Sequence, residues 1–222
     1  MLFDQLSTVQ WISISILPLL FAIILHEIAH GWVAMKLGDN TAKMMGRLTL
    51  NPISHIDPIG TIAVPLGLLL MSSLFGGMMI FGWAKPVPIN WRNLRKPRRD
   101  IALVSVAGPA ANLLMAIFWL IILKMTPEPT LVGDLNTAAF FWMMAVLGVL
   151  FNLLLMVLNL LPLLPLDGGR ILNSLLPYNL ARQYAASEPY GFFILLALLA
   201  LDLLHYLLAP AMWLFRLFIG FA

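Results

Sequence analysis

Cysteine and charge are the two things this chain has little of. The 222 residues include no cysteine, and only 10% are charged, whereas 61% are hydrophobic. Without cysteine there are no disulfides and no thiolate metal ligands, so any metal ion must be held by His, Asp or Glu. The composition disfavours a disordered chain, which needs low hydrophobicity, and an ordinary soluble domain, which is about a quarter charged. A lipid bilayer is the solvent that fits it.

The net charge of +3 does not indicate a nucleic-acid-binding protein. Five of the 13 basic residues fall within residues 92–99, between two apolar stretches. Such a local cluster is typical of a cytoplasmic loop of a membrane protein. We therefore expect the bilayer as a partner and no nucleic acid.

Five apolar stretches predict the fold, which is an all-α polytopic membrane protein with a bundle of about four to six transmembrane helices. Residues 1–222 are expected to form a single domain. The core helices are expected at about residues 9–37, 101–123 and 137–166, and the C-terminal helices at about 191–221. A re-entrant or extended region is expected at about residues 41–90. The sequence does not indicate an oligomeric state.

Charge also predicts the topology. The basic loop at residues 84–100 should face the cytoplasm, which leaves the N-terminus outside and places residues 167–170 on the cytoplasmic side. The stretch at 59–83 must then start and end on one side, so its glycines and Pro65 favour a re-entrant segment. The alternative is one full crossing, with the basic loop outside. Alternating residues at 41–50 and prolines in 80–89 predict a small membrane-associated β-hairpin or sheet.

The strongest chemical signal is His26-Glu27-Ile28-Ala29-His30, near the end of the first apolar stretch. Residues four apart share one face of a helix, so both imidazoles can bind one Zn²⁺ while Glu27 serves as general base. Ionisable groups near lipid are costly, and they indicate function by default.

A catalytic zinc ion needs three protein ligands and a water molecule. The chain has only four histidines and no cysteine. The remaining candidates are His55, His205, Asp57, Asp167 and Asp202. Asp167 is the best placed, because two prolines precede it and two glycines follow it. We expect Asp202 and His205, three residues apart on the last helix, to pair with each other.

At this point the sequence resembles a known family, the site-2 protease family of intramembrane zinc metalloproteases. The resemblance lies in the His-Glu-x-x-His motif, in Leu166-Asp167-Gly168, in Asn159 eight residues earlier, and in Ala107-Gly108-Pro109 with Asn112. Further motifs, among them His55 and residues 81–87, resemble the compact bacterial and archaeal subgroup without PDZ or CBS domains. The resemblance implies one zinc ion bound by His26, His30 and Asp167, with Glu27 as the catalytic acid–base residue.

The expected function is therefore hydrolysis of peptide bonds within or next to the transmembrane segments of substrate proteins, in the cell membrane and near its cytoplasmic side. Asn159 is a candidate transition-state or substrate contact, and Asn112, Asn152 and His55 are weaker candidates. Each Asn has hydrogen bonding between helices as its alternative, and His55 has a structural loop role. Two other functions stay open, namely a membrane metal transporter that uses the same cluster and a zinc site that is only structural.

Overall fold

A computed structural model of the chain describes residues 6–64, 67, 84–129 and 137–220. Three long helices run side by side through it: α1 (Thr8–Leu37), α4 (Pro97–Met125) and α5 (Thr137–Leu160). Each is long and apolar enough to cross a membrane. These three lie where the core helices are predicted, although α5 ends at Leu160 rather than near residue 166.

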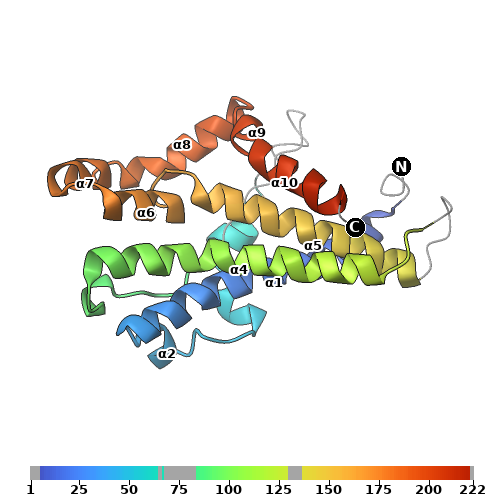
Figure 1. Cartoon of the computed structure of the whole chain (residues 1–222), viewed down its shortest axis with the longest axis horizontal. Coiled ribbons are helices and arrows are strands. Elements are labelled where there is room, and N and C mark those ends of the chain that lie inside the picture. The colour runs from blue at the N-terminus through green and yellow to red at the C-terminus, as the bar shows by residue number, and fades with distance from the viewer. Residues whose placement is uncertain (1–5, 65–66, 68–83, 130–136, 221–222) are drawn as a thin grey trace.

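The core of the bundle lies where α4 and α5 meet beside α1 (Figure 1). The indole of Trp119 on α4 packs against α5 at Gly148, where any added Cβ would collide with the ring. Ile14 of α1 and Met143 and Leu153 of α5 are almost completely buried in or beside this contact. In lipid, close packing of this kind holds helices together, because lipid tails are as apolar as the side chains.

The C-terminal part is a series of shorter helices: α6 (Asp167–Leu175), α7 (Tyr178–Ala185), α8 (Glu188–Ala200), α9 (Leu204–Leu207) and α10 (Ala209–Gly220). α6 packs against α4, and α10 packs against α5. The apolar run at 191–221 is thus divided, with Asp202 in the left-handed conformation (φ 55°) at the break. The described residues contain three helices of spanning length, fewer than the four to six predicted. The predicted Asp202–His205 pair is confirmed, with 3.4 Å between Oδ1 and Nδ1.

The predicted β-hairpin or sheet is wrong, because the described residues contain no β-strand. Residues 41–44 form the short helix α2 (Thr41–Met44), and Gly46 (φ 64°) turns the chain after it. Residues 84–90 have no regular secondary structure, and side chains supply most of their hydrogen bonds. A period-two pattern specifies a strand only where a neighbouring strand is available for pairing, and prolines 86 and 88 lack the N–H groups for it.

Between α1 and α4 the chain contains the turns η2 (Pro52–His55), η3 (Pro58–Ala63) and η4 (Trp91–Asn93). Residues 65–83, apart from residue 67, lie outside the described residues. They include most of the predicted re-entrant segment at 59–83 and the first residues of the 80–89 stretch.

Asp39 joins the loop after α1 to the loop before α4. Its carboxylate is fully buried and accepts hydrogen bonds from Thr41, from the Asn90 N–H and from Asn93. Burial raises the pKa of Asp39, but these hydrogen bonds outweigh burial and hold the pKa below its ordinary value. The chain at residues 90–93 is thereby anchored at the end of α1.

Candidate metal centre and active site

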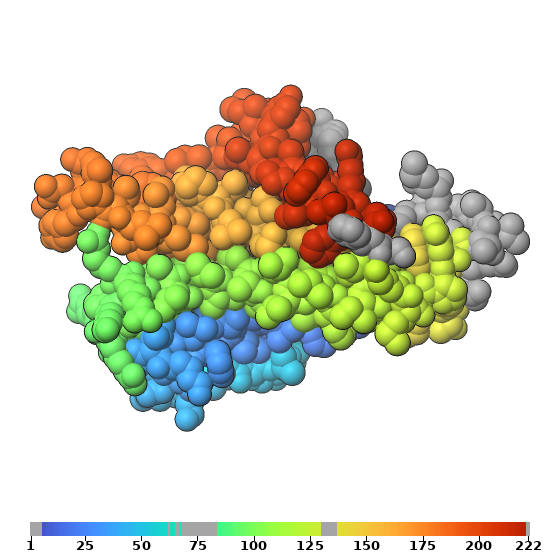
Figure 2. Space-filling model, viewed as in Figure 1, coloured from blue at the N-terminus to red at the C-terminus, as the bar shows by residue number. Residues whose placement is uncertain are grey.

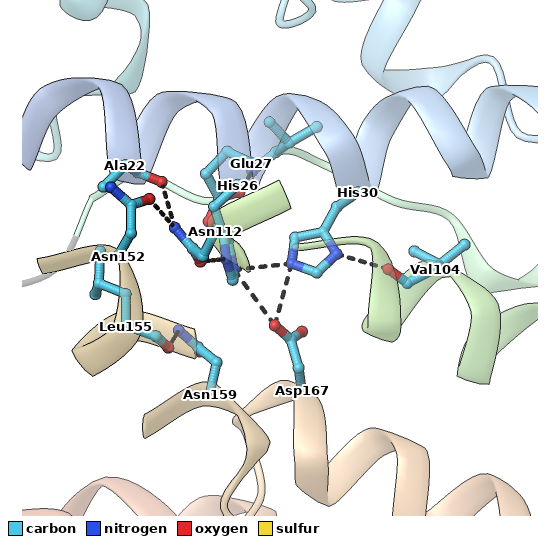
Figure 3. Close-up of polar contacts among 11 residues, drawn as sticks. Ala22, His26, Glu27, His30, Val104, Asn112, Asn152, Leu155, Asn159 and Asp167 are labelled. Carbon is cyan, nitrogen blue, oxygen red and sulfur yellow. Dashed lines mark hydrogen bonds and ion pairs between the residues drawn. The ribbon is translucent and has the colours of Figure 1, made fainter. Parts of the chain in front are cut away.

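His26 and His30 lie one turn apart on the face of α1 that is buried against α4 (Figure 3). Their residues are only 8% and 7% exposed. The Nδ1 atom of His30 lies 2.7 Å from the carbonyl oxygen of Val104, an obligate acceptor, so Nδ1 carries the proton. That tautomer leaves the Nε2 lone pair of His30 free to bind a metal ion.

His26 is oriented in the same way by a chain of buried amides. Its Nδ1 lies 2.7 Å from Oδ1 of Asn112, on α4. The amide group of Asn112 donates to the carbonyl of Ala22 and to Oδ1 of Asn152, and Asn152 donates to the carbonyl of Gly148. Because both N–H bonds of Asn112 are used in this way, its oxygen must face His26 and accept the Nδ1 proton. Three helices thus fix one imidazole (Figure 3).

Asp167 comes to the two imidazoles from α6, whose first residue it is. Residues 161–166, with prolines 162 and 165, end α5 and turn the chain back. Gly168 and Gly169 press against the backbone of this turn, where a Cβ at either position would collide with it. The Asp167 carboxylate therefore projects toward α1, with Oδ2 at 3.3 Å from Nε2 of His26 and 3.2 Å from Nε2 of His30.

The donor set fits a zinc ion. The Nε2 atoms of His26 and His30 are 3.0 Å apart, so two ring lone pairs and a buried carboxylate oxygen converge on one point. Three acceptors at such distances repel one another unless a cation lies between them. Tetrahedral zinc with ligands at about 2.0–2.1 Å places those ligands about 3.3 Å apart, which matches the spacing here.

Gly108 lets α4 approach the metal centre. A Cβ at this position would run into the imidazole rings of both His26 and His30. This close contact is the physical reason for a glycine in Ala107-Gly108-Pro109. The rings are packed between α4 and Asp167, which restricts their orientation.

Glu27 faces a cavity of about 640 Å³ beside the metal centre. Oε2 of Glu27 accepts a hydrogen bond of 2.7 Å from the backbone N–H of Val87. The cavity is bounded by the irregular chain at 84–89 and by α8, and its lining includes Asn159, Asp167 and Phe192. A carboxylate, three candidate zinc ligands and room for an extended peptide thus share one space.

Arg170, one turn after Asp167 on α6, holds two walls of this cavity together. Its guanidinium pairs with Glu188 of α8 at 3.0 Å and lies 5.2 Å from the centre of the Trp91 ring. The sequence predicts only a cytoplasmic position for Arg170 and no role in the site, although residues three apart on a helix share a face and Arg170 follows a candidate ligand at that spacing.

The other predicted site residues lie in different places. Asn159 lines the cavity, but its amide donates to the carbonyl of Leu155 on its own helix. His55 does not join the metal centre, and its Nε2 bonds the carbonyl of Thr49. Asp57 caps η3 by accepting from the N–H groups of Ile59 and Gly60.

Comparison with known proteins gives one consistent result. The profile of peptidase family M50 matches residues 14–138 and 125–201. "Putative zinc metalloprotease YwhC" of Bacillus subtilis is 41% identical over 199 residues, covering 88% of this chain and 84% of that protein. "Putative zinc metalloprotease Rip2" is 32% identical in Mycolicibacterium smegmatis (88% of this chain, 71% of that protein) and 30% identical in Mycobacterium tuberculosis H37Rv (89% and 71%). No solved structure matches the chain.

Proposed function

This chain belongs to peptidase family M50 and is an intramembrane zinc metalloprotease, and from that premise we propose that His26, His30 and Asp167 bind its single catalytic zinc ion while Glu27 is its acid–base residue. The observation that carries the assignment is the convergence of three metal-binding atoms, 3.0 to 3.3 Å apart, beside the cavity that Glu27 faces. The metal-transporter alternative finds no support in the family or in the relatives.

The protein's own groups divide the work of hydrolysis. A zinc ion held by His26, His30 and Asp167 would supply Lewis-acid chemistry, polarising the scissile carbonyl and lowering the pKa of water toward about 7. The Glu27 carboxylate would accept a proton from the attacking water and later donate it to the leaving amine. The Val87 N–H holds Oε2 of Glu27, which limits the rotation of the carboxylate. His26 and His30 keep their ring protons on Nδ1, because the Asn112 oxygen and the Val104 carbonyl accept them.

The substrate in this proposal is a transmembrane segment that is locally unwound and lies in the bilayer. A helical peptide bond is shielded, and the cavity beside Glu27 is bounded by residues 84–89, which form neither helix nor strand. Residues 48–50 form bends after α2 and are not among the residues that line the cavity, whereas residues 84 and 86–89 line it. The N–H groups of Lys85 and Val87 and the carbonyls of Lys85 and Pro86 bond within the protein, so the main-chain groups of residues 88 and 89 are the candidate substrate contacts. Asn159 also lines the cavity.

We place the site near the cytoplasmic face of the cell membrane. His30 lies seven residues before the end of α1, which is about 10 Å along the helix axis. Figure 2 shows the chain around the start of α4 next to α7, and Arg98 donates to the carbonyl of Leu176 between α6 and α7. Arg95, in the most basic stretch of the chain (residues 92–99), donates its N–H to the carbonyl of Leu37 at the end of α1. This stretch thus lies at the end of the bundle where α1 ends, and basic loops favour the cytoplasm.

The test compares Glu27→Gln with the wild-type enzyme and with Glu128→Gln, an exposed control after α4. Cleavage is followed by proteomics of membrane peptides and then with a fluorogenic transmembrane peptide, and zinc by elemental analysis. Glu27→Gln should keep its zinc and lose about 100-fold or more in kcat, because it cannot accept a proton. Cleavage at the wild-type rate by a zinc-loaded Glu27→Gln enzyme would refute the assigned role.

A further inference from the structure

The chain at residues 84–90 passes beside the motif on α1 without forming a helix or strand. Its position is fixed by hydrogen bonds to four separate parts of the molecule. The Lys85 N–H donates to the carbonyl of His55, and the Asn90 N–H donates to Asp39. Between these two anchors, the Val87 N–H donates to Glu27 and the Arg47 side chain donates to two carbonyls.

Val87 carries the single backbone N–H of the tripeptide Pro86-Val87-Pro88, because proline has none. That one donor is aimed at Oε2 of Glu27, 2.7 Å away. The Val87 side chain is 5% exposed and packs on α1 at Gly31, where an added Cβ would lie 2.8 Å from its Cγ1. The contact thus lies within one turn of both His30 and Glu27.

Arg47 approaches this tripeptide from the other side. It follows Gly46, whose left-handed conformation (φ 64°) turns the chain after α2, and its own N–H bonds back to the carbonyl of Ala42. Its Nη2 donates to the carbonyl of Lys85 at 2.9 Å and to that of Pro86 at 3.3 Å. The next residue, Leu48, packs on Gly31 beside Val87, with 2.6 Å between an added Cβ and its Cδ2.

The charge of Arg47 has no carboxylate partner among the hydrogen bonds and ion pairs of the described residues. The residue is nevertheless only 8% exposed, and its Nε has no hydrogen-bond partner. Burying a guanidinium against neutral carbonyls is costly. An apolar side chain would fill the same space without this desolvation cost.

The geometry of the peptide group supplies a reason for the charge. The carbonyl of Pro86 and the N–H of Val87 belong to the same planar peptide unit, and in a trans peptide they point in opposite directions. A guanidinium that holds the Pro86 oxygen therefore fixes the direction of the Val87 N–H on the far side, toward Glu27. The positive charge also polarises that amide, which strengthens its N–H as a donor.

We propose that Arg47 is a positioning residue of this protease, which orients the Glu27 carboxylate through the Pro86–Val87 peptide group; this inference rests on the proposed acid–base role of Glu27. Arg47 does not touch the zinc ligands in this arrangement. Its removal lets the Pro86–Val87 peptide rotate, so that Glu27 loses a charge-assisted hydrogen bond and samples unproductive rotamers. The effect belongs to the chemical step rather than to metal or substrate binding.

The experiment measures kcat, KM and zinc content for Arg47→Gln and Arg47→Lys, with a fluorogenic transmembrane peptide in detergent. Arg92→Gln is the matched control, since Arg92 is exposed and its side chain makes no hydrogen bond or ion pair with the residues that the structure describes. Arg47→Gln should lose about tenfold to hundredfold in kcat, while KM changes by less than about twofold. It should still hold one zinc ion per chain. Arg47→Lys, which offers one donor group in place of a fork, should recover part of that loss.

Two further comparisons separate positioning from a general structural role. Val87→Pro deletes the N–H and should match the kcat loss of Arg47→Gln, whereas Val87→Ala keeps the N–H and should lose less. In a Glu27→Asp background, where the shorter side chain withdraws from Val87, Arg47→Gln should cost little more, because residues that act as a unit are not additive.

Loss of zinc in Arg47→Gln, equal effects of Val87→Pro and Val87→Ala, or full additivity with Glu27→Asp would each overturn the inference. Wild-type kcat in Arg47→Gln would do the same while leaving Glu27 in its role, provided that Glu27→Gln is inactive. An active Glu27→Gln enzyme would instead remove the proposed function itself.

Discussion

Replacing Asn112 with leucine tests whether the buried amides orient a zinc ligand. Leucine has nearly the shape of asparagine but removes the acceptor for the Nδ1 proton of His26 and both donors, to Ala22 and Asn152. Without that acceptor, His26 can rotate or take the other tautomer, whose Nε2 carries the proton and cannot bind zinc.

The size of the effect follows from the role of such outer contacts. Loss of a hydrogen bond that orients a metal-binding histidine lowers metal affinity by about 10- to 100-fold, which is about 1.4–2.7 kcal/mol. Asn152→Leu should have a smaller effect, under about tenfold, because Asn112 keeps its bonds to His26 and Ala22. Asn179→Leu, at an exposed position on α7, is the matched control and should bind zinc like the wild type.

Zinc affinity is measured on purified protein in detergent by competition with a chelating dye, and helix content by circular dichroism. The graded order is informative where helix content stays at the wild-type value, because the loss of zinc affinity is then not caused by unfolding. A folded Asn112→Leu protein with wild-type zinc affinity would refute the reasoning, and so would an equal loss in Asn179→Leu.

Two other predictions concern the topology and the pH dependence of stability. The chain has no cysteine of its own, so Lys96→Cys and Glu128→Cys can each be labelled as a single cysteine with an impermeant maleimide. Lys96→Cys should react from the cytoplasm and Glu128→Cys from outside. Reaction of Lys96→Cys only from outside would overturn the topology. The pKa of Asp39 in the folded protein lies below its value of about 3.9 in the unfolded chain. The ionised Asp39 carboxylate therefore stabilises the fold above about pH 3.9, and this stabilisation is lost as the pH falls through the folded-state pKa. Asp39→Asn should therefore unfold at a lower temperature than the wild type at pH 7, with the difference shrinking below about pH 4, as followed by tryptophan fluorescence; a difference that does not change with pH would contradict this role of the charge.

The candidate metal ligands could be predicted from the sequence because their arrangement is largely local. The spacing of His26 and His30 becomes proximity on any helix, since residues four apart share a face. The absence of cysteine left few candidates for the third ligand, and the Pro and Gly residues around Asp167 indicated a turn that the structure shows. Hydrophobicity alone predicted the three spanning helices, because the cost of exposing polar groups to lipid acts on each segment separately.

The tertiary structure decided everything that depends on which segments meet. Alternation at 41–50 predicted a strand, but a strand exists only with a partner, and this stretch instead turns back at Gly46 to direct Arg47. Asn159 ranked above Asn112 in the sequence, yet Asn112 is the residue that faces His26, because α4 comes close to α1 at Gly108. The bond from Val87 to Glu27 joins residues 60 positions apart. No local sequence pattern encodes such a contact. It forms only when tertiary packing brings the irregular segment at 84–90 against α1, and the sequence of α1 does not specify which segment packs there.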